Sequence, residues 1–333
     1  MRSIVVVSLA ALVSAIGCGG GQGLRLERLD ASVQKPSNVA VYFTVETADG
    51  EPVAGLEAES FRIYEDDRLV SIHESKQTIL NPEVAAAHYT LLLVDMSGSV
   101  VESGDVPVIV DSATAFANRV GQYQEIAVYA FDGRPDLDKM AGFAREPEKV
   151  QRGIQKLAGF HTRDPSTNLN GAIVQALQVL DRQMSRARVP LRFGTLVVFT
   201  DGSDRAARVD REALHKAIED TGYDIFVIGV GTEIDEEELE LIGQSGTIMT
   251  KDRAEIASAF EQAALRVEAF SRRYYLLGYC SPARAGVHVV RIEAEYSGKT
   301  GDLTYEFDAR GFKPLCDPTK KPAFDVRRPR PRR

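Results

Sequence analysis

The sequence predicts an α/β protein in which a doubly wound, mostly parallel sheet is inserted into a β-sandwich-like domain built from both flanking segments. Between residues 87 and 270, apolar runs typical of buried strands alternate with helical stripes. On both sides of that interval, apolar and polar residues alternate as in half-buried strands. Each flank alone has too few strands for two layers, so we expect the flanks to combine; two separate β units are the alternative.

Residues 1–18 have the layout of a secretory signal. Arg2 is followed by an apolar run, Ile4 to Ile16, that is too short to span a bilayer. The segment 14–18, Ser-Ala-Ile-Gly-Cys, resembles a bacterial lipobox, in which the cysteine is lipidated. The resemblance implies a lipid anchor on Cys18 and an exported protein on a membrane of the bacterial cell envelope, periplasmic or at the cell surface. The alternative is an ordinary signal peptide with a chance cysteine.

Residues 19–38 are predicted to be a linker because they begin with a run of glycines. The first segment of the β domain follows at residues 39–86. Its first strand has one apolar face and ends at the turn signal Asp49-Gly50. Shorter strands are predicted at residues 61–64 and 69–72.

The α/β domain is predicted at residues 87–270. Short apolar runs predict buried strands at residues 90–94, 126–131, 195–200 and 225–230. Apolar residues at helical spacing predict helices between them, including a last helix that ends near Phe270. In such a fold the binding site lies at the carboxyl ends of the strands.

Residues 271–316 supply the second segment of the β domain, with three more alternating strands. Cys280 and Cys316 are an even pair without metal-binding spacing, so in an exported protein we expect a disulfide, with free thiols as the alternative. Residues 317–333 are predicted to be a disordered, basic, proline-rich tail. The net charge of −8 over 333 residues argues against nucleic acid as a partner.

Three oxygen donors follow the first strand of the α/β domain. Asp95, Ser97 and Ser99 share one tight loop, in which Gly98 lets the backbone fold back. Thr167 precedes a later helix and Asp201 ends the strand 195–200, so the sheet would bring both to the same edge. A single Asp-x-Ser-x-Ser match is explained more readily by helix capping than by a metal site, but the ordered set is far more specific.

This ordered set resembles the metal-ion-dependent adhesion site of von Willebrand factor type A domains. The resemblance covers about the middle half of the chain and implies that Ser97, Ser99 and Thr167 contact a divalent cation. It also implies that Asp95 and Asp201 act partly through water. The segment from Asp49 onward resembles, more weakly, a β segment that precedes such domains in bacterial surface proteins.

The donor types indicate the cation and its use. Magnesium prefers octahedral oxygen coordination and manganese can replace it, whereas calcium suits a small site less well. With only two carboxylates in the set, a carboxylate from a protein partner is the natural additional ligand. We therefore expect a binding protein, not an enzyme, that docks an acidic group in adhesion or envelope assembly. The alternatives are a scaffold lipoprotein whose metal only stabilises loops, and a metal-dependent hydrolase, for which no general base is evident.

Overall fold

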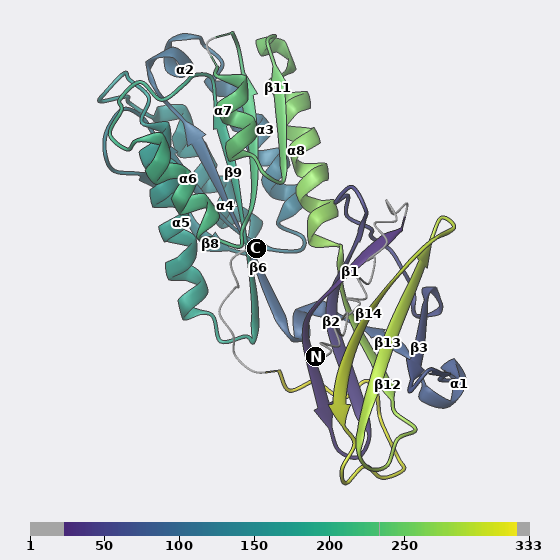
Figure 1. Cartoon of the computed structure of the whole chain (residues 1–333). Helices are drawn as coiled ribbons and strands as arrows, with labels where there is room; N and C mark the ends of the chain where they lie inside the picture. The colour runs from purple at the N-terminus through teal and green to yellow at the C-terminus, as the bar shows by residue number, and fades with distance from the viewer. Residues whose placement is uncertain (1–22, 233, 325–333) are drawn as a thin grey trace, which may run out of the picture.

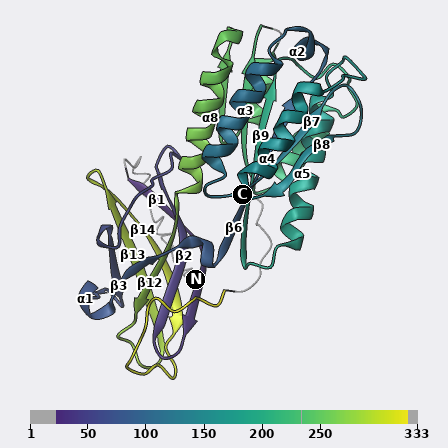
Figure 2. The ribbon, with the colours of Figure 1, turned by 180° about the vertical axis from the view of Figure 1, so that it is seen from behind.

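The computed structural model describes residues 23–232 and 234–324. The segment that contains Cys18 and the arginine-rich end of the chain, residues 325–333, lie outside the described residues. Two lobes are visible in Figure 1 and, from behind, in Figure 2: an α/β lobe and a β-sandwich lobe. The described part of the chain starts in the sandwich, passes through the α/β lobe and returns to the sandwich.

The α/β lobe is built on a six-stranded sheet with the order β11-β10-β9-β6-β7-β8. All its neighbouring strands are parallel except β7 and β8, which are antiparallel. In β6, Leu92 and Leu93 are both fully buried but pack into the cores on opposite faces. This explains the unbroken apolar run, since burying each leucine stabilises the fold by about 2 kcal/mol. The strands are β6 (Ala86–Asp95), β7 (Glu125–Phe131), β8 (Asp138–Ala144), β9 (Leu191–Thr200), β10 (Asp224–Val230) and β11 (Gly246–Thr250).

Helices cover both faces of this sheet. The core on one face includes residues of α3 (Val106–Val120), α4 (Pro147–Ile154) and α8 (Ile256–Ser271). The core on the other face includes residues of α5 (Leu169–Arg186), α6 (Arg211–Glu219) and α7 (Glu236–Ile242). Shorter helical turns at the sheet edge are α2 (Gly98–Glu102), η3 (Gln155–Gly159) and η4 (Arg253–Glu255).

The sandwich contains two antiparallel four-stranded sheets, and each sheet mixes strands from both flanks of the α/β lobe. The fold class predicted from the sequence is therefore confirmed. One sheet contains β1 (Leu24–Gln34), β2 (Asn38–Thr47), β12 (Tyr274–Cys280) and β5 (Thr78–Leu80). The other contains β14 (Lys299–Asp308), β13 (Val287–Tyr296), β3 (Phe61–Glu65) and β4 (Arg68–Leu69). Short helical turns are η1 (Ala58–Ser60), α1 (Ile72–Ser75) and η2 (Pro82–Val84).

The structure corrects two boundaries at the start of the chain. The interval 19–38, predicted as a linker, contains β1, which pairs with β2 along its length. A bulge between Arg28 and Asp30 interrupts the register, so the strand lacks the clean alternation by which it would be recognised. The strand predicted at residues 69–72 is also shorter, because β4 ends at Leu69 and residue 72 begins α1.

The C-terminal segment is ordered further than the sequence predicts. Residues 317–324 were expected in a disordered tail, yet Phe324 is buried against the ring of Tyr42. The side-chain nitrogen of Asn38 donates to the carbonyl oxygen of Asp317 at 2.7 Å. The disulfide between Cys280 and Cys316, which is confirmed, holds the start of this segment against the end of β12.

The two lobes meet through aromatic rings and ion pairs. The ring of Tyr274 lies 4.4 Å from that of Phe193, which belongs to β9. The buried guanidinium of Arg273 pairs with Asp224 of β10 and Glu46 of β2.

The chain enters the sandwich beside this junction. The carbonyl oxygen of Gly23 accepts a hydrogen bond from the backbone nitrogen of Ala48 at 3.1 Å. Nearby, Arg266 of α8 pairs with Glu51. Of the described helices, none is both long enough and apolar enough to cross a membrane.

Candidate metal site

The five predicted donors lie in loops at one edge of the six-stranded sheet. Asp95 is the last residue of β6, and Asp201 directly follows β9. The two strands are parallel neighbours that pair Val94 with Phe199, so their carboxyl ends meet. The other donors come from the turn that begins α2 and from the loop before α5.

Hydrogen bonds join four of the donors directly. The hydroxyl of Ser99 donates to Asp201 Oδ1 at 2.7 Å, and the hydroxyls of Ser97 and Ser99 lie 3.3 Å apart. The backbone nitrogen of Ser97 donates to Asp95 Oδ1 at 2.9 Å. The structure thus brings residues more than 100 positions apart in the sequence into one polar cluster.

The loop that carries Thr167 is bonded to both neighbouring loops. The backbone nitrogen of Gly98 donates to the carbonyl oxygen of Pro165 at 3.0 Å. A Cβ on Gly98 would lie only 2.9 Å from the Cβ of Pro165, so this close approach requires glycine. The carbonyl oxygen of Thr167 accepts from the backbone nitrogens of Arg205 and Ala206, both at 2.9 Å.

Two further residues that sequence reasoning missed support the site. Asp132 is fully buried at the end of β7 and accepts from the backbone nitrogen of Arg163 at 3.0 Å, which fixes the start of the Thr167 loop. The hydroxyl of Thr200 donates to Asp95 Oδ2 at 2.7 Å. Their positions in the sequence could have indicated both residues, because each lies at the carboxyl end of a strand that pairs with β6.

Burial determines the electrostatics of the cluster. The side chain of Asp95 has no exposure to solvent, and burial raises its pKa to about 7, although hydrogen bonds from Ser97 and Thr200 lower it. The nearby carboxylate of Asp201 raises the pKa of Asp95 further. A buried carboxylate beside a second one is unfavourable unless positive charge balances them. The guanidinium of Arg253, 2.8 Å from Asp201 Oδ2, supplies part of that charge, and a bound cation would supply more.

The chemistry of the donors fits a hard divalent cation. The set offers hydroxyl and carboxylate oxygens, the ligands that Mg²⁺ and Mn²⁺ prefer. Across residues 23–232 and 234–324, no group of three or more His, Cys, Asp or Glu side chains is arranged to hold a metal.

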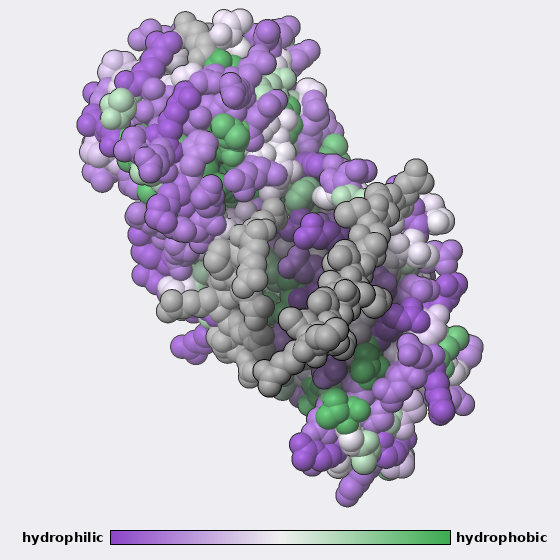
Figure 3. Space-filling model, viewed as in Figure 1, coloured by the Kyte–Doolittle hydropathy of each residue, from purple (hydrophilic) through white to green (hydrophobic). Residues whose placement is uncertain are grey.

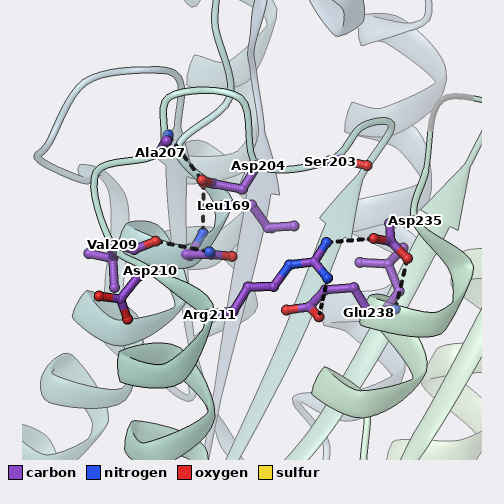
Figure 4. A pocket seen from close by; sticks show the side chains of 11 residues that line it. Leu169, Ser203, Asp204, Ala207, Val209, Asp210, Arg211, Asp235 and Glu238 are labelled. Atoms are coloured by element: carbon purple, nitrogen blue, oxygen red, sulfur yellow. Dashed lines mark hydrogen bonds and ion pairs between the residues drawn. The ribbon is translucent and has the colours of Figure 1, made fainter.

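A pocket of about 270 Å³ lies next to the loop that follows β9 (Figure 4). Ser203 and Asp204 of that loop form one wall. Arg211 extends from α6 across the opposite side, where its guanidinium pairs with Asp235 and Glu238. The arginine is thus held by acidic residues of the pocket itself.

The visible surface of the α/β lobe is predominantly hydrophilic, with small separate apolar spots (Figure 3). This distribution is typical of a domain that faces water.

Solved structures with a similar arrangement share little sequence with this chain. Proximal thread matrix protein 1 from the mussel byssus is 16% identical with a TM-score of 0.47, covering 56% of this chain and 49% of its own. This chain therefore matches about half the length of that protein. A von Willebrand factor type A protein from Catenulispora acidiphila is 14% identical with a TM-score of 0.45, covering 86% and 73%. The manganese-loaded TRAP protein of Plasmodium vivax is 12% identical with a TM-score of 0.46, covering 74% and 98%.

No curated protein matches the sequence. A family model does match, that of the von Willebrand factor type A domain, over residues 91–264. The match spans more than half of the 333 residues and contains all five predicted donors. The chain therefore belongs to the von Willebrand factor type A domain family.

Proposed function

We propose that this protein binds a divalent cation, Mg²⁺ or Mn²⁺, and uses it to dock a carboxylate of a protein partner in the cell envelope. The cation would be held by Ser97, Ser99, Thr167, Asp95 and Asp201. When bound, it supplies a positive centre that attracts an acidic side chain. The proposed role is adhesion or envelope assembly, without a catalytic step.

The observation that carries this proposal is the hydrogen bond between Ser99 and Asp201. It joins the turn after β6 to the loop after β9 at 2.7 Å, so oxygen donors from both loops lie within reach of one small ion. Asp95 and Ser97 beneath them are fully buried, whereas Ser99 is exposed. The cluster therefore opens to solvent on the side where a partner would approach.

Docking is favoured over a purely structural role because backbone hydrogen bonds join the loops directly. Backbone hydrogen bonds connect Gly98 to Pro165 and connect Thr167 to Arg205. We therefore expect chelated protein to remain folded while it loses partner binding.

The cation site is tested by titration with Mn²⁺, followed by electron paramagnetic resonance of the free ion. Ser99→Ala removes the hydroxyl that faces Asp201 and is expected to weaken Mn²⁺ binding at least about tenfold, because loss of a group that only orients a metal ligand already costs that much. Ser185→Ala is the matched control, because the Ser185 hydroxyl donates only to the carbonyl oxygen of Arg182 at the far end of α5. Equal Mn²⁺ affinity in both variants would contradict the assignment.

The proposal includes the location of the protein. The apolar segment before Cys18 and the lipobox resemblance support export and a lipid anchor on that cysteine. Anchoring would hold the domain at a membrane surface, where a cation-dependent docking site meets partners of the envelope.

A further inference from the structure

We propose that Arg253 tunes this cation site: it lowers the affinity for the cation and strengthens the hold of the loaded site on a carboxylate. The inference rests on the proposed function, because it requires a cation beside Asp201. It assigns a specificity role to a residue outside the donor set.

Arg253 lies in η4, directly before α8, and reaches the donor set from a fourth segment of the chain. Its Nη2 atom lies 2.8 Å from Asp201 Oδ2, and its Nη1 atom lies 2.7 Å from Asp105 Oδ2. Asp201 Oδ1 accepts the hydrogen bond from Ser99, so both carboxylate oxygens are engaged. One faces the proposed cation ligands and the other faces a guanidinium.

Burial makes this ion pair significant. The side chain of Asp201 is 1% exposed, whereas that of Arg253 is 38% exposed. Arginine keeps its charge at any physiological pH, so Asp201 is permanently shared between the guanidinium and whatever occupies the donor set. In a partly buried site the effective dielectric constant is well below that of water, and one added charge changes ion affinity appreciably.

The charge of Arg253 acts in opposite directions on the two binding steps. It repels an incoming divalent cation and neutralises part of the Asp201 charge, which weakens cation binding. Once the cation is in place, the same charge leaves the site more positive, which strengthens binding of an anionic group. A residue that merely fastened the loops together would not produce opposite effects on cation and anion.

Replacing Asp105 is expected to have effects opposite to those of replacing Arg253. It is the residue before α3 and pairs with the other nitrogen of the same guanidinium. Asp105→Asn removes a negative charge next to Arg253 while Arg253 and Asp201 stay in place. The cation should then bind more weakly and the carboxylate more tightly, the reverse of removing Arg253.

The experiment measures two affinities in the full chain. Mn²⁺ binding is titrated by electron paramagnetic resonance, and acetate binding to the Mn²⁺-loaded protein is followed by the paramagnetic broadening of the acetate methyl signal. Arg253→Gln is expected to bind Mn²⁺ about tenfold more tightly and acetate several-fold more weakly. Asp105→Asn is expected to shift both affinities in the reverse directions. Arg253→Lys keeps the charge but not the two-nitrogen contact, so its Mn²⁺ affinity is expected to lie closer to that of the unaltered protein than to that of Arg253→Gln.

The outcomes separate this inference from the function on which it rests. Absence of Mn²⁺ binding in the unaltered protein would overturn both. If the unaltered protein binds Mn²⁺ and Arg253→Gln binds it with the same or lower affinity, only the role of Arg253 is overturned. Circular dichroism shows whether Arg253→Gln folds. If it does not, Asp105→Asn decides: an Asp105→Asn protein that binds Mn²⁺ as tightly as the unaltered protein, or more tightly, would overturn the inference.

Discussion

Single residues shape the proposed site through what surrounds them. Asp95 is fully buried, and it is held by Ser97 on one oxygen and by Thr200 on the other. Its orientation is therefore set by the fold before any cation arrives, and a preorganised ligand loses little conformational freedom on binding. Gly98 allows the turn after β6 to lie close to Pro165, and a larger residue at this position would prevent that contact.

His88 is the residue for which the structure predicts a measurable pH effect. It lies in β6 at the junction between the lobes, with its ring 4.9 Å from that of Phe193 and 5.0 Å from that of Tyr274. Burial among these rings lowers the pKa of His88 from 6.5 to about 4. The charged groups whose fields act on it are Asp224, which raises its pKa, and Arg273 and Arg145, which lower it.

The free energy of unfolding is expected to fall as the pH is lowered from about 6.5 to about 4. In that window the unfolded chain binds a proton at His88 and the folded chain does not. Above this pH window His88 is neutral in both states and does not change the free energy of unfolding. Below the window the decrease in the free energy of unfolding is complete and amounts to at most about 3 kcal/mol. His88→Phe keeps a ring beside Phe193 and removes the titration.

The measurement is chemical denaturation of both proteins at a series of pH values in a chelating buffer. Because all other groups titrate in both proteins, the difference between their curves isolates His88. Parallel curves between pH 6.5 and 4 would show that burial does not shift the pKa of this histidine.

At the residue level, the clustering of the five candidate donors could be predicted and their electrostatic partners could not. Asp95, Ser97, Ser99, Thr167 and Asp201 follow a local pattern, a polar residue at a strand end or before a helix. Arg253 shows no local signal, because its partners Asp201 and Asp105 lie 52 and 148 positions away. Pairings of that range depend on the finished fold.

At the level of elements, central strands were predicted more readily than edge strands. The central strands β6 and β9 are buried on both faces, so the apolar run itself marks them. The outer strands β8 and β11 are only partly buried and lack that run. β1 is an edge strand with a bulge and several charged residues, so it shows no clear strand pattern to set against the glycine run on which the linker prediction rests.

The C-terminal segment depends on its disulfide for its position. Cys280 and Cys316 close a loop with a sequence separation of 36. Replacing both with serine is expected to lower the free energy of unfolding by about 3 kcal/mol, because the unfolded chain regains the freedom that the bridge removes. Chemical denaturation under oxidising conditions measures the loss.

Reduction provides the control for this variant. Dithiothreitol should destabilise the unaltered protein by a similar amount and leave the Cys280→Ser, Cys316→Ser double variant unchanged. A double variant as stable as the oxidised protein would mean that contacts such as the one between Asn38 and Asp317 hold the segment alone.

On the scale of the whole molecule, the interleaving of the lobes could be predicted because neither flank is sufficient on its own. Strands from both ends of the chain meet in each sheet, as between β2 and β12 or β3 and β13. The contacts between the lobes could not be predicted. The cluster of Tyr42, Phe193 and Tyr274 joins three strands whose sequences separately indicate only buried aromatic residues.

The proposed anchor gives a prediction for the complete protein in a bacterial cell. Cys18→Ala is expected to move the protein from the membrane fraction to the soluble fraction of the envelope, because the acylated thiol is lost. Cell fractionation with immunodetection measures this, and mass spectrometry of the N-terminal peptide identifies the lipid. Gly20→Ala, outside the lipobox resemblance, is the control. A Cys18→Ala protein that stays in the membrane fraction would exclude the lipid anchor.

The start of β1 has a mechanical consequence for a tethered protein. Gly23 lies beside Ala48, next to the pairing of Glu51 with Arg266 of α8. A tether would therefore emerge close to the junction between the two lobes. Tension between the membrane and a captured partner would then travel through the base of the α/β lobe. The half of the sandwich farther from that lobe would lie off the direct path between the tether and the donor set.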